Sequence, residues 1–295
     1  MRKIIAVIVT YHPDAVQLLR LIEVAAGQVD QVLVIDNATP GFTSSAFALS
    51  NVPVQVNHQN LGLAAAYNQG VVFGRAHGAS HILLFDQDSC PSPTMVKELV
   101  DAWVQAEQRG LRVAAAGPNY TDAKGHYQSP FVKIQGLKLV RVSCGQGETV
   151  EVDHLISSGC LISMEAINDV GAFEDQLFID YVDTEWCLRA RHHDYALLGV
   201  GAADMEHDLG ESYLTVFNRR VPSHSPLRHY YLVRNGCWLI SRPWVGWRWR
   251  FIDSVRLFKI LVVFSVFSVN RYQHCRMMVV GLFHAVRKRM GKLPT

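Results

Sequence analysis

Residues 81–89 read HILLFDQDS, and this stretch decides the fold. A short apolar run typical of a strand ends directly in two carboxylates, Asp86 and Asp88. In α/β sheets, ligands bind beyond the carboxyl ends of the strands, so these polar residues stand where chemistry is expected.

The same pattern surrounds this stretch on both sides. Strands are expected at 3–10 (KIIAVIVT), 31–35, 52–56 and 112–116, and helices at about 15–26, 62–77 and 93–109. Short strands alternating with helices predict an α/β fold with a parallel sheet covered by helices. The polar residues that follow the strands are Tyr11, Asp36, the segment Asn57 to Asn60, and Asp86, Gln87 and Asp88.

The regular alternation stops after residue 116. Residues 119–151 are rich in Gly, Ser and polar side chains, which favours hairpins or a partly mobile loop. A second cluster of candidate residues runs from SSGC (157–160) through LFIDYVDTEW (177–186) to Glu206 and His207. From about Arg228 the sequence becomes helical, aromatic and basic, so we expect domains at 1–225 and 226–295.

Asp86 and Asp88 are spaced to hold a divalent cation. In an extended backbone two such residues point to the same side, with roughly 6.5–7 Å between their Cα atoms. Mg²⁺ or Mn²⁺ favours a few carboxylate and water ligands completed by phosphate oxygens. The alternative is a pair of solvated loop acids.

Asp36 and Asn60 each allow two interpretations. Asp36 ends a strand where a carboxylate can bind a base or ribose, but the Asp-Asn pair also starts turns. Asn60 precedes a run of small residues that lets a helix approach the sheet or a nucleotide, and it is equally a good helix N-cap. The first strand lacks a following G-x-G-x-x-G, which argues against a dinucleotide-binding dehydrogenase.

Asp183 and Glu185 are candidates for a general base. A carboxylate in a partly apolar cleft gains proton affinity by desolvation, and it can then accept a proton from a sugar hydroxyl. Both acids also suit the start of a helix, where the macrodipole favours negative charge. His207 follows this acidic cluster, and its imidazole can join the aspartates on a metal.

Charge is divided unevenly along the chain. From Arg219 onward there are 15 Lys and Arg residues and one acid, Asp253, against 13 basic and 25 acidic residues before it. Such asymmetry indicates a partner with an anionic surface. The six scattered cysteines include no C-x-x-C pair, so reduced thiols are expected rather than a zinc site or disulfide framework. The apolar run near Met1 is too short for a signal peptide, and a cytoplasmic chain is expected.

Seven motifs in order resemble inverting glycosyltransferase family 2, which has the GT-A fold. They are VIVTYH, VIDN, the Asn- and Gly-bounded stretch 60–70, LLFDQDS, SSGCLIS, LFIDYVDTEWCLRA and the later Glu-His pair. The resemblance covers about residues 3–235. Within the family, DQDS with SSGC and FIDYVDTEW is most similar to rhamnosyltransferases that use dTDP-L-rhamnose.

The resemblance implies roles for individual residues. Asp36 would contact the pyrimidine, Asp88 with Asp86 would hold Mg²⁺ or Mn²⁺ on the diphosphate, and His207 would complete the metal site. Asp183 aligns with the base, although Val182 and Glu185 depart from the family pattern on either side of it. Arg234 would reach the diphosphate or serve the structure, and Tyr11, Asn60 and Gln87 would line the nucleotide-sugar site.

The implied reaction is a metal-dependent, inverting transfer of L-rhamnose to a bacterial surface glycan or lipid-linked acceptor of the lipopolysaccharide type. Two alternatives remain: a family member that uses a UDP-hexose or UDP-N-acetylhexosamine donor, and a non-catalytic nucleotide-sugar-binding protein. The carboxylates and His207 argue against the non-catalytic one.

The C-terminal region suggests a membrane surface. Trp244, Trp247 and Trp249 alternate with arginines, and the uncharged run 260–269 is far shorter than the roughly 20 residues that span a bilayer. This composition predicts an interfacial anchor on anionic lipid at the inner face of the cytoplasmic membrane. A packed helical cap is the alternative, and no nucleic-acid-binding motif accompanies the charge.

Overall fold

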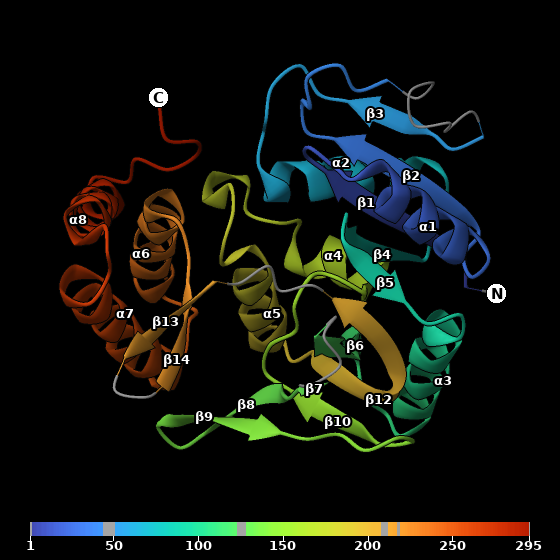
Figure 1. Ribbon diagram of the computed structural model, residues 1–295. Helices are drawn as coiled ribbons and strands as arrows, with labels where there is room; N and C mark the ends of the chain where they lie inside the picture. Colours follow the sequence, from blue (N-terminus) through green and yellow to red (C-terminus); the bar gives the residue numbers. More distant parts are fainter. Residues whose placement is uncertain (1, 44–50, 123–127, 208–211, 217–218, 295) are drawn as a thin grey trace.

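The computed structural model describes residues 2–43, 51–122, 128–207, 212–216 and 219–294. Within these residues, a ten-stranded mixed sheet lies at the centre, and three C-terminal helices lie together on one side of it (Figure 1). The sheet strands are β1 (Ile4–Thr10), β2 (Gln31–Asp36), β3 (Val54–Val56), β4 (His81–Asp86), β5 (Ser89–Pro91), β6 (Val113–Asp122), β7 (Gln128–Ser129), β10 (Thr149–Val152), β11 (Cys160–Ser163) and β12 (Ala196–His207).

Helices surround the sheet and form the C-terminal region. They are α1 (Ala15–Ala26), α2 (Leu63–Ala76), α3 (Met95–Gln108), α4 (Met164–Val170), the 3₁₀ turn η1 (Asp175–Leu177), α5 (Val182–His192), α6 (Pro226–Ile240), α7 (Trp247–Val266) and α8 (Arg271–Val286). The helices and strands predicted for the first third of the chain are confirmed, with small shifts at their ends.

The strand order brings three carboxyl ends to one edge. Along the sheet it is β10-β12-β6-β11-β4-β1-β2-β3. β1 pairs in parallel with both β2 and β4, so Thr10 lies opposite Asp36, and Val9 lies opposite Asp86. β11 is antiparallel to β4 and β6, so the sheet is mixed, as expected of the GT-A fold that the motifs implied.

Two cores lie on opposite faces of the sheet because side chains alternate along each strand. Ile4, Ala6 and Ile8 of β1 pack with α1 and α3 on one face. Val7 and Val9 pack with α2, α4 and α5 on the other. Each fully buried aliphatic side chain contributes roughly 1.5–3 kcal/mol, so burial on both faces strongly stabilises the central strands.

Small residues let α2 lie close to β1. A Cβ atom placed on Gly70 would come within 2.6 Å of the Val7 side chain, so only glycine fits there. The small residues of α2 therefore serve close packing on the sheet, as the sequence predicted.

Hairpins fill part of the segment after β6. β8 (Phe131–Gln135) and β9 (Lys138–Val142) pair antiparallel around a tight turn in which Gly136 has a φ of +60°. β13 (Ser212–Val216) and β14 (Arg219–Ser223) form a second hairpin. β6 itself continues to Asp122, beyond its predicted end, because it pairs with β12 past a β-bulge between Val200 and Asp204.

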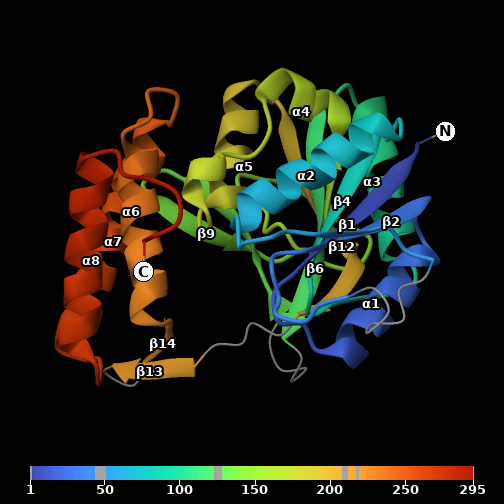
Figure 2. The same ribbon diagram turned by 90° about the horizontal axis from the view of Figure 1, so that it is seen from above.

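The C-terminal helices stack beside the sheet, with α6 nearest to it and α7 and α8 outermost (Figure 2). Pro226 begins α6, and the Ser225 side chain caps its first turn. Among the described residues, no helix combines the length and apolarity that a bilayer crossing requires. Trp247 is exposed and Trp244 is partly buried against the core, whereas Trp249 is buried and therefore does not fit the predicted interfacial role.

Candidate active site

The Asp86-Gln87-Asp88 segment lies at the shared carboxyl edge of β1, β2 and β4. The strand ends at Asp86, and the chain turns at Gln87 and Asp88. The extended backbone that the sequence predicted from Asp86 to Asp88 is therefore replaced by a turn. Gln87 holds this turn against β1, because its Oε1 accepts a hydrogen bond of 2.7 Å from the Tyr11 backbone amide. Gln87 and Tyr11 thus come together, and both carboxylates are partly exposed.

The backbone of His207 lies beside this turn. β12 pairs antiparallel with β5, and His207 is opposite Ser89, the residue after Asp88. Of the side chains that the structure describes, no three His, Cys, Asp or Glu gather as a metal cluster, and the His207 side chain is outside that set. Asp86 and Asp88 offer the carboxylate oxygens that Mg²⁺ and Mn²⁺ prefer, and the backbone of His207 lies next to their turn.

The Ser-Ser-Gly-Cys motif comes to the same place. The Ser158 hydroxyl hydrogen-bonds to the Ser89 hydroxyl, and both side chains are buried. Asn119 of β6, which lies opposite Asp204 of β12, is also buried. Its Nδ2 has no hydrogen-bond partner. The motifs at 86–89 and 157–160 are therefore joined in space.

Asp36 is fully buried at the end of β2. Its carboxylate accepts hydrogen bonds from the hydroxyls of Thr10 and Thr39, at 3.0 and 2.6 Å, and from the Thr39 amide at 2.7 Å. These are the contacts of the turn-forming role that the Asp-Asn pair allows. In this conformation Asp36 supports the loop after β2.

Asn60 precedes α2 but is not its N-cap. Its Oδ1 accepts a hydrogen bond of 2.9 Å from the Gly62 amide, and Gly62 is the N-cap. Gly62 has a φ of +89°, and a Cβ there would meet the Phe178 backbone at 2.6–2.8 Å. Asn60 thus shapes a turn that only glycine permits and that lies directly against Phe178.

Asp183 begins α5 and is half-enclosed, with 26% of its side chain exposed. Burial alone would raise its pKa, but His154 and the amide and hydroxyl of Thr184 outweigh burial and lower the pKa. The Thr184 amide donates to Asp183 Oδ1 at 2.7 Å. The sequence predicted that desolvation would raise the proton affinity of this carboxylate. In the structure its pKa is lowered instead, so Asp183 stays ionised.

His154 is a functional candidate that the sequence analysis missed. Its Nε2 lies 3.8 Å from Asp183 Oδ1 and has no hydrogen-bond partner although it is buried. The residue stands in an isolated bridge with Val132, three residues before the Ser-Ser-Gly-Cys motif. A histidine inside that motif cluster was the only signal in the sequence.

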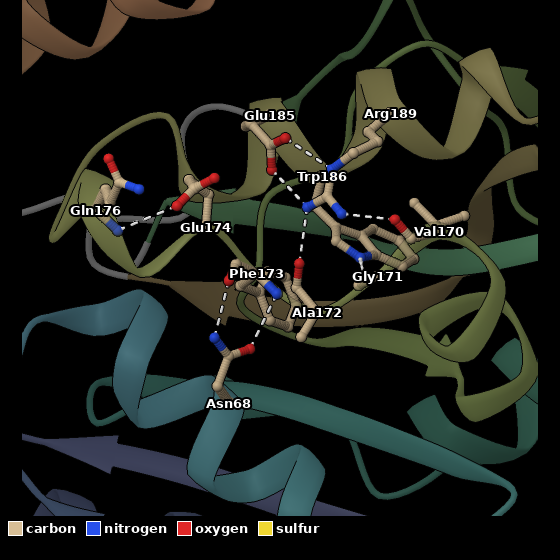
Figure 3. A network of polar contacts seen from close by, with 10 residues as sticks. All are labelled: Asn68, Val170, Gly171, Ala172, Phe173, Glu174, Gln176, Glu185, Trp186 and Arg189. Carbon is tan, nitrogen blue, oxygen red and sulfur yellow. Dashed lines mark hydrogen bonds and ion pairs between the residues drawn. The ribbon is translucent and has the colours of Figure 1, made fainter. Parts of the chain in front are cut away.

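Glu185 faces away from this site into an ion pair. It is 2% exposed, and its two oxygens accept hydrogen bonds from Arg189 Nε and Nη2 at 2.7 and 2.8 Å. Arg189 also donates to the carbonyls of Val170 and Ala172 (Figure 3). Burial raises the pKa of Glu185, and Arg189 offsets part of that rise. Of the two acids that the sequence left open as the base, Glu185 is paired with Arg189.

Tyr67 of α2 contacts the strand-end carboxylate Asp86. Its hydroxyl donates to Asp86 Oδ1 at 3.1 Å, and the side chain is fully buried. Burial first, then the charge of Asp86, raise the pKa of Tyr67 well above its usual value, with smaller contributions that include the charge of Asp183. The two carboxylates therefore act on one phenol. In the sequence, the sign that Tyr67 has a role in the site was its place among the small residues of this helix.

Arg234 and Asn235 of α6 hold the loop that leads to Asp183. Arg234 is fully buried and donates to the carbonyls of Gln176, Leu177 and Gly291. The Asn235 amide donates to the carbonyls of Leu177, Ile179 and Asp180 at 2.7–2.9 Å. The donors of Arg234 are thus used within the protein, which matches the structural alternative considered for it.

Two surface cavities lie away from these carboxylates. One of about 550 Å³ is bordered by Lys133 and Glu151, and one of about 470 Å³ is bordered by Glu174, Trp238 and Trp244. The candidate site is therefore assigned from Asp86 and Asp88 on the turn after β4, from Tyr67, which contacts Asp86, and from Asp183, whose charge acts on Tyr67.

Comparison with known proteins identifies relatives. The sequence model of the family described as Glycosyl transferase family 2 matches residues 6–171. The chain is 34% identical over 243 residues to dTDP-rhamnosyl transferase RfbF of Shigella flexneri, and the match covers 81% of this chain and 80% of that protein.

Solved structures share the fold. TarS 1-349 of S. aureus aligns with a TM-score of 0.59 and 15% identity over 97% of this chain and 82% of that chain. GalNAc-T7, solved with UDP, GalNAc and Mn²⁺, aligns with a TM-score of 0.58 and 12% identity over 86% of this chain, which spans 54% of the GalNAc-T7 chain. Together with the family match, the mixed sheet and its helices confirm the predicted GT-A fold.

Replacing Asp183 and replacing Glu185 should lower the free energy of unfolding by different amounts. Glu185→Gln leaves Arg189 without its buried counter-charge, and we expect the free energy of unfolding to fall by about 3 kcal/mol. Asp183→Asn keeps the shape of a partly exposed side chain and should change that free energy by less than about 1 kcal/mol. Urea unfolding of both variants measures the difference. Equal losses would show that the Glu185 to Arg189 pair does not anchor α5.

Proposed function

The chain belongs to glycosyl transferase family 2, and from this premise we propose that it transfers L-rhamnose from dTDP-L-rhamnose, with inversion, to a hydroxyl of a bacterial surface glycan or glycolipid. The observation that carries the proposal is a strand-end carboxylate, Asp86, hydrogen-bonded to Tyr67, together with a separate ionised carboxylate, Asp183, whose charge also raises the pKa of Tyr67. The choice of donor is supported by the 34% identity to dTDP-rhamnosyl transferase RfbF.

Asp86, Asp88 and His207 would hold a Mg²⁺ or Mn²⁺ ion. The ion would neutralise the charge that grows on the departing diphosphate, where fixed electrostatics contribute most. Two observations favour this set: the turn presents both carboxylates at the sheet edge, and the strand register puts His207 beside Ser89. The structure of GalNAc-T7, which shares the fold, includes Mn²⁺.

Asp183 would act as the general base. Its lowered pKa keeps it ionised near neutral pH, so it can accept the proton of the acceptor hydroxyl. The acceptor oxygen then bonds to the anomeric carbon while the bond from that carbon to the diphosphate oxygen breaks on the opposite side. One displacement of this kind inverts the anomeric configuration and leaves no covalent intermediate.

The remaining predicted residues would form the nucleotide-sugar site at the same edge. Tyr11 and Gln87 border the turn that carries the aspartates, and Asn60 shapes the entrance of α2. We propose that Asp36 fixes the loop against which the pyrimidine lies. For Arg234 we propose a positioning role, because its donors bind carbonyls of the loop 176–177 and Gly291.

The acceptor is proposed to be lipid-linked and presented at the inner face of the cytoplasmic membrane. The support is the basic C-terminal region, in which residues 219–294 contain a single acid. The catalytic domain would span 1–225, and the C-terminal helices 226–295 would form a helical region that braces the catalytic loop through α6.

A donor screen tests this function. With extracted membrane glycolipids as acceptor, we expect nucleotide release from dTDP-L-rhamnose to exceed release from UDP-glucose and UDP-N-acetylglucosamine by about tenfold or more, which corresponds to about 1.4 kcal/mol of discrimination. Release should need Mg²⁺ or Mn²⁺ and should be lost in Asp88→Ala.

Turnover in excess EDTA would contradict the metal site, and preference for a UDP-sugar would contradict the donor. Glu98→Ala is the matched control for Asp88→Ala, since Glu98 lies on α3, outside the site, and its loss should leave release unchanged.

His154 should set the pH range of the reaction. Its removal in His154→Ala withdraws a contact that lowers the pKa of Asp183 and leaves burial, which raises it. The pKa of Asp183 then rises, so the acid limb of the kcat/KM profile should move to higher pH. Asp183→Asn should lower transfer by about 10²-fold or more at every pH.

The control is His193→Ala, which removes an exposed histidine at the end of α5 and should leave the profile in place. A His154→Ala profile that coincides with that of the unmodified protein would show that His154 does not act on the base.

A further inference from the structure

α7 is apolar on two sides. Its inner side buries Trp249, Leu257 and Phe264 against the rest of the protein. Its outer side exposes apolar residues at intervals of three or four, which places them in one stripe along the helix. The stripe consists of Trp247, Phe251, Val255, Phe258, Val262 and Val266. Trp247 and Phe258 are 66% and 67% exposed, so the largest side chains of the stripe are accessible to solvent.

α8 carries a second exposed stripe. Its members are Tyr272, Val279, Leu282, Phe283 and Val286. α8 follows α7 after four residues, and the two helices lie side by side on the outer side of α6, away from the sheet (Figures 1 and 2). We call the exposed sides of α7 and α8 together the outer helical face. A helical surface this apolar normally faces a partner.

The charges around the outer helical face have one sign. The exposed charged side chains on or next to the two helices are Arg248, Arg256, Lys259, Arg271, Arg276, Arg287, Lys288, Arg289 and Lys292. The one acid of the region, Asp253, is 1% exposed and accepts hydrogen bonds from the Tyr181 hydroxyl, 2.9 Å from each of its oxygens. The exposed side chains of α7 and α8 thus combine apolar stripes with charges of one sign.

We propose that the outer helical face docks on an anionic phospholipid surface. α7 and α8 would lie in the plane of the interface, with the aromatic and aliphatic stripes at the acyl boundary and the lysines and arginines on the lipid phosphates. Charge favours lipid over a second copy of the chain, because two such faces would bring positive side chains against positive side chains. An anionic bilayer complements both features at once.

The surface is connected to the catalytic part. Asp253 on the inner side of α7 binds Tyr181, two residues before Asp183, and α6 holds the preceding loop through Asn235. Docking would therefore fix the direction in which the site opens relative to the bilayer. This orientation rests on the proposed function, whereas vesicle binding itself needs neither donor nor acceptor.

Co-sedimentation of the full chain with vesicles tests the surface. Binding is expected to vesicles of phosphatidylglycerol and phosphatidylcholine and to be at least about tenfold weaker with phosphatidylcholine alone. Raising NaCl from about 0.15 to about 1 M should release part of the protein and leave a fraction held by the apolar stripes.

Two pairs of substitutions separate the two contributions. Phe251→Ser with Phe258→Ser should weaken binding by about tenfold or more and remove the fraction that survives salt. Lys259→Glu with Arg276→Glu should weaken binding to anionic vesicles by a similar factor and leave the neutral vesicles unaffected. The matched control is Val16→Ser with Val72→Ser, residues 76% and 64% exposed on α1 and α2, which should bind like the unmodified protein.

Thermal unfolding of each variant confirms that it is folded. The proposal is overturned if the unmodified protein stays in the supernatant with anionic vesicles at low salt, or if the Phe251 and Phe258 variant binds as well as the control. It is also overturned if the chain is a dimer that this variant dissociates, because the face then joins two copies. If the unmodified protein turns over the donor but does not bind anionic vesicles, the surface is refuted and the proposed function still stands.

Discussion

The hydrogen bonds from α6 to the loop 176–180 are the constraint on which the rest of the site depends. Arg234 and Asn235 direct their donors at carbonyls of this loop. Phe178, Asp180 and Tyr181 have φ angles of +61° to +67°, a conformation that costs of order 1–3 kcal/mol per non-glycine residue. The loop keeps this shape only because the surrounding hydrogen bonds fix it. Asp183 lies in the first turn of the helix that follows, so α6 helps to fix its position.

Two acids two residues apart on α5 are given different roles by their surroundings. Glu185 is buried against Arg189, which ties α5 to the carbonyls of Val170 and Ala172. Asp183 faces His154 and the strand ends, where hydrogen bonds and charge hold its pKa below the usual value despite burial. Glu185 thus stabilises the helix on which Asp183 lies. Residues two apart on a helix point in nearly opposite directions, and this spacing is what separates the structural acid from the reactive one.

Much of this arrangement could be predicted from sequence because it follows from local patterns. Apolar runs ending in Asp36 and Asp86 gave the strands and their shared edge, and the ordered motifs gave the family. Other features depend on contacts between distant segments. The meeting of His154 with Asp183, the commitment of Arg234 to loop carbonyls, and the burial of Trp249 beside an exposed Trp247 each need the tertiary fold. The turn at Gln87 was missed because extended spacing was assumed where the chain had already reversed.

In the proposed reaction, a single displacement assisted by Asp183 transfers the sugar. The most direct test is the anomeric configuration of the product formed from dTDP-L-rhamnose, measured by the one-bond carbon–proton coupling at the anomeric carbon in NMR. We expect a rhamnoside whose anomeric configuration is opposite to that of the donor. A product with the donor's configuration retained would mean two displacements or a front-side mechanism, and it would contradict the role assigned to Asp183.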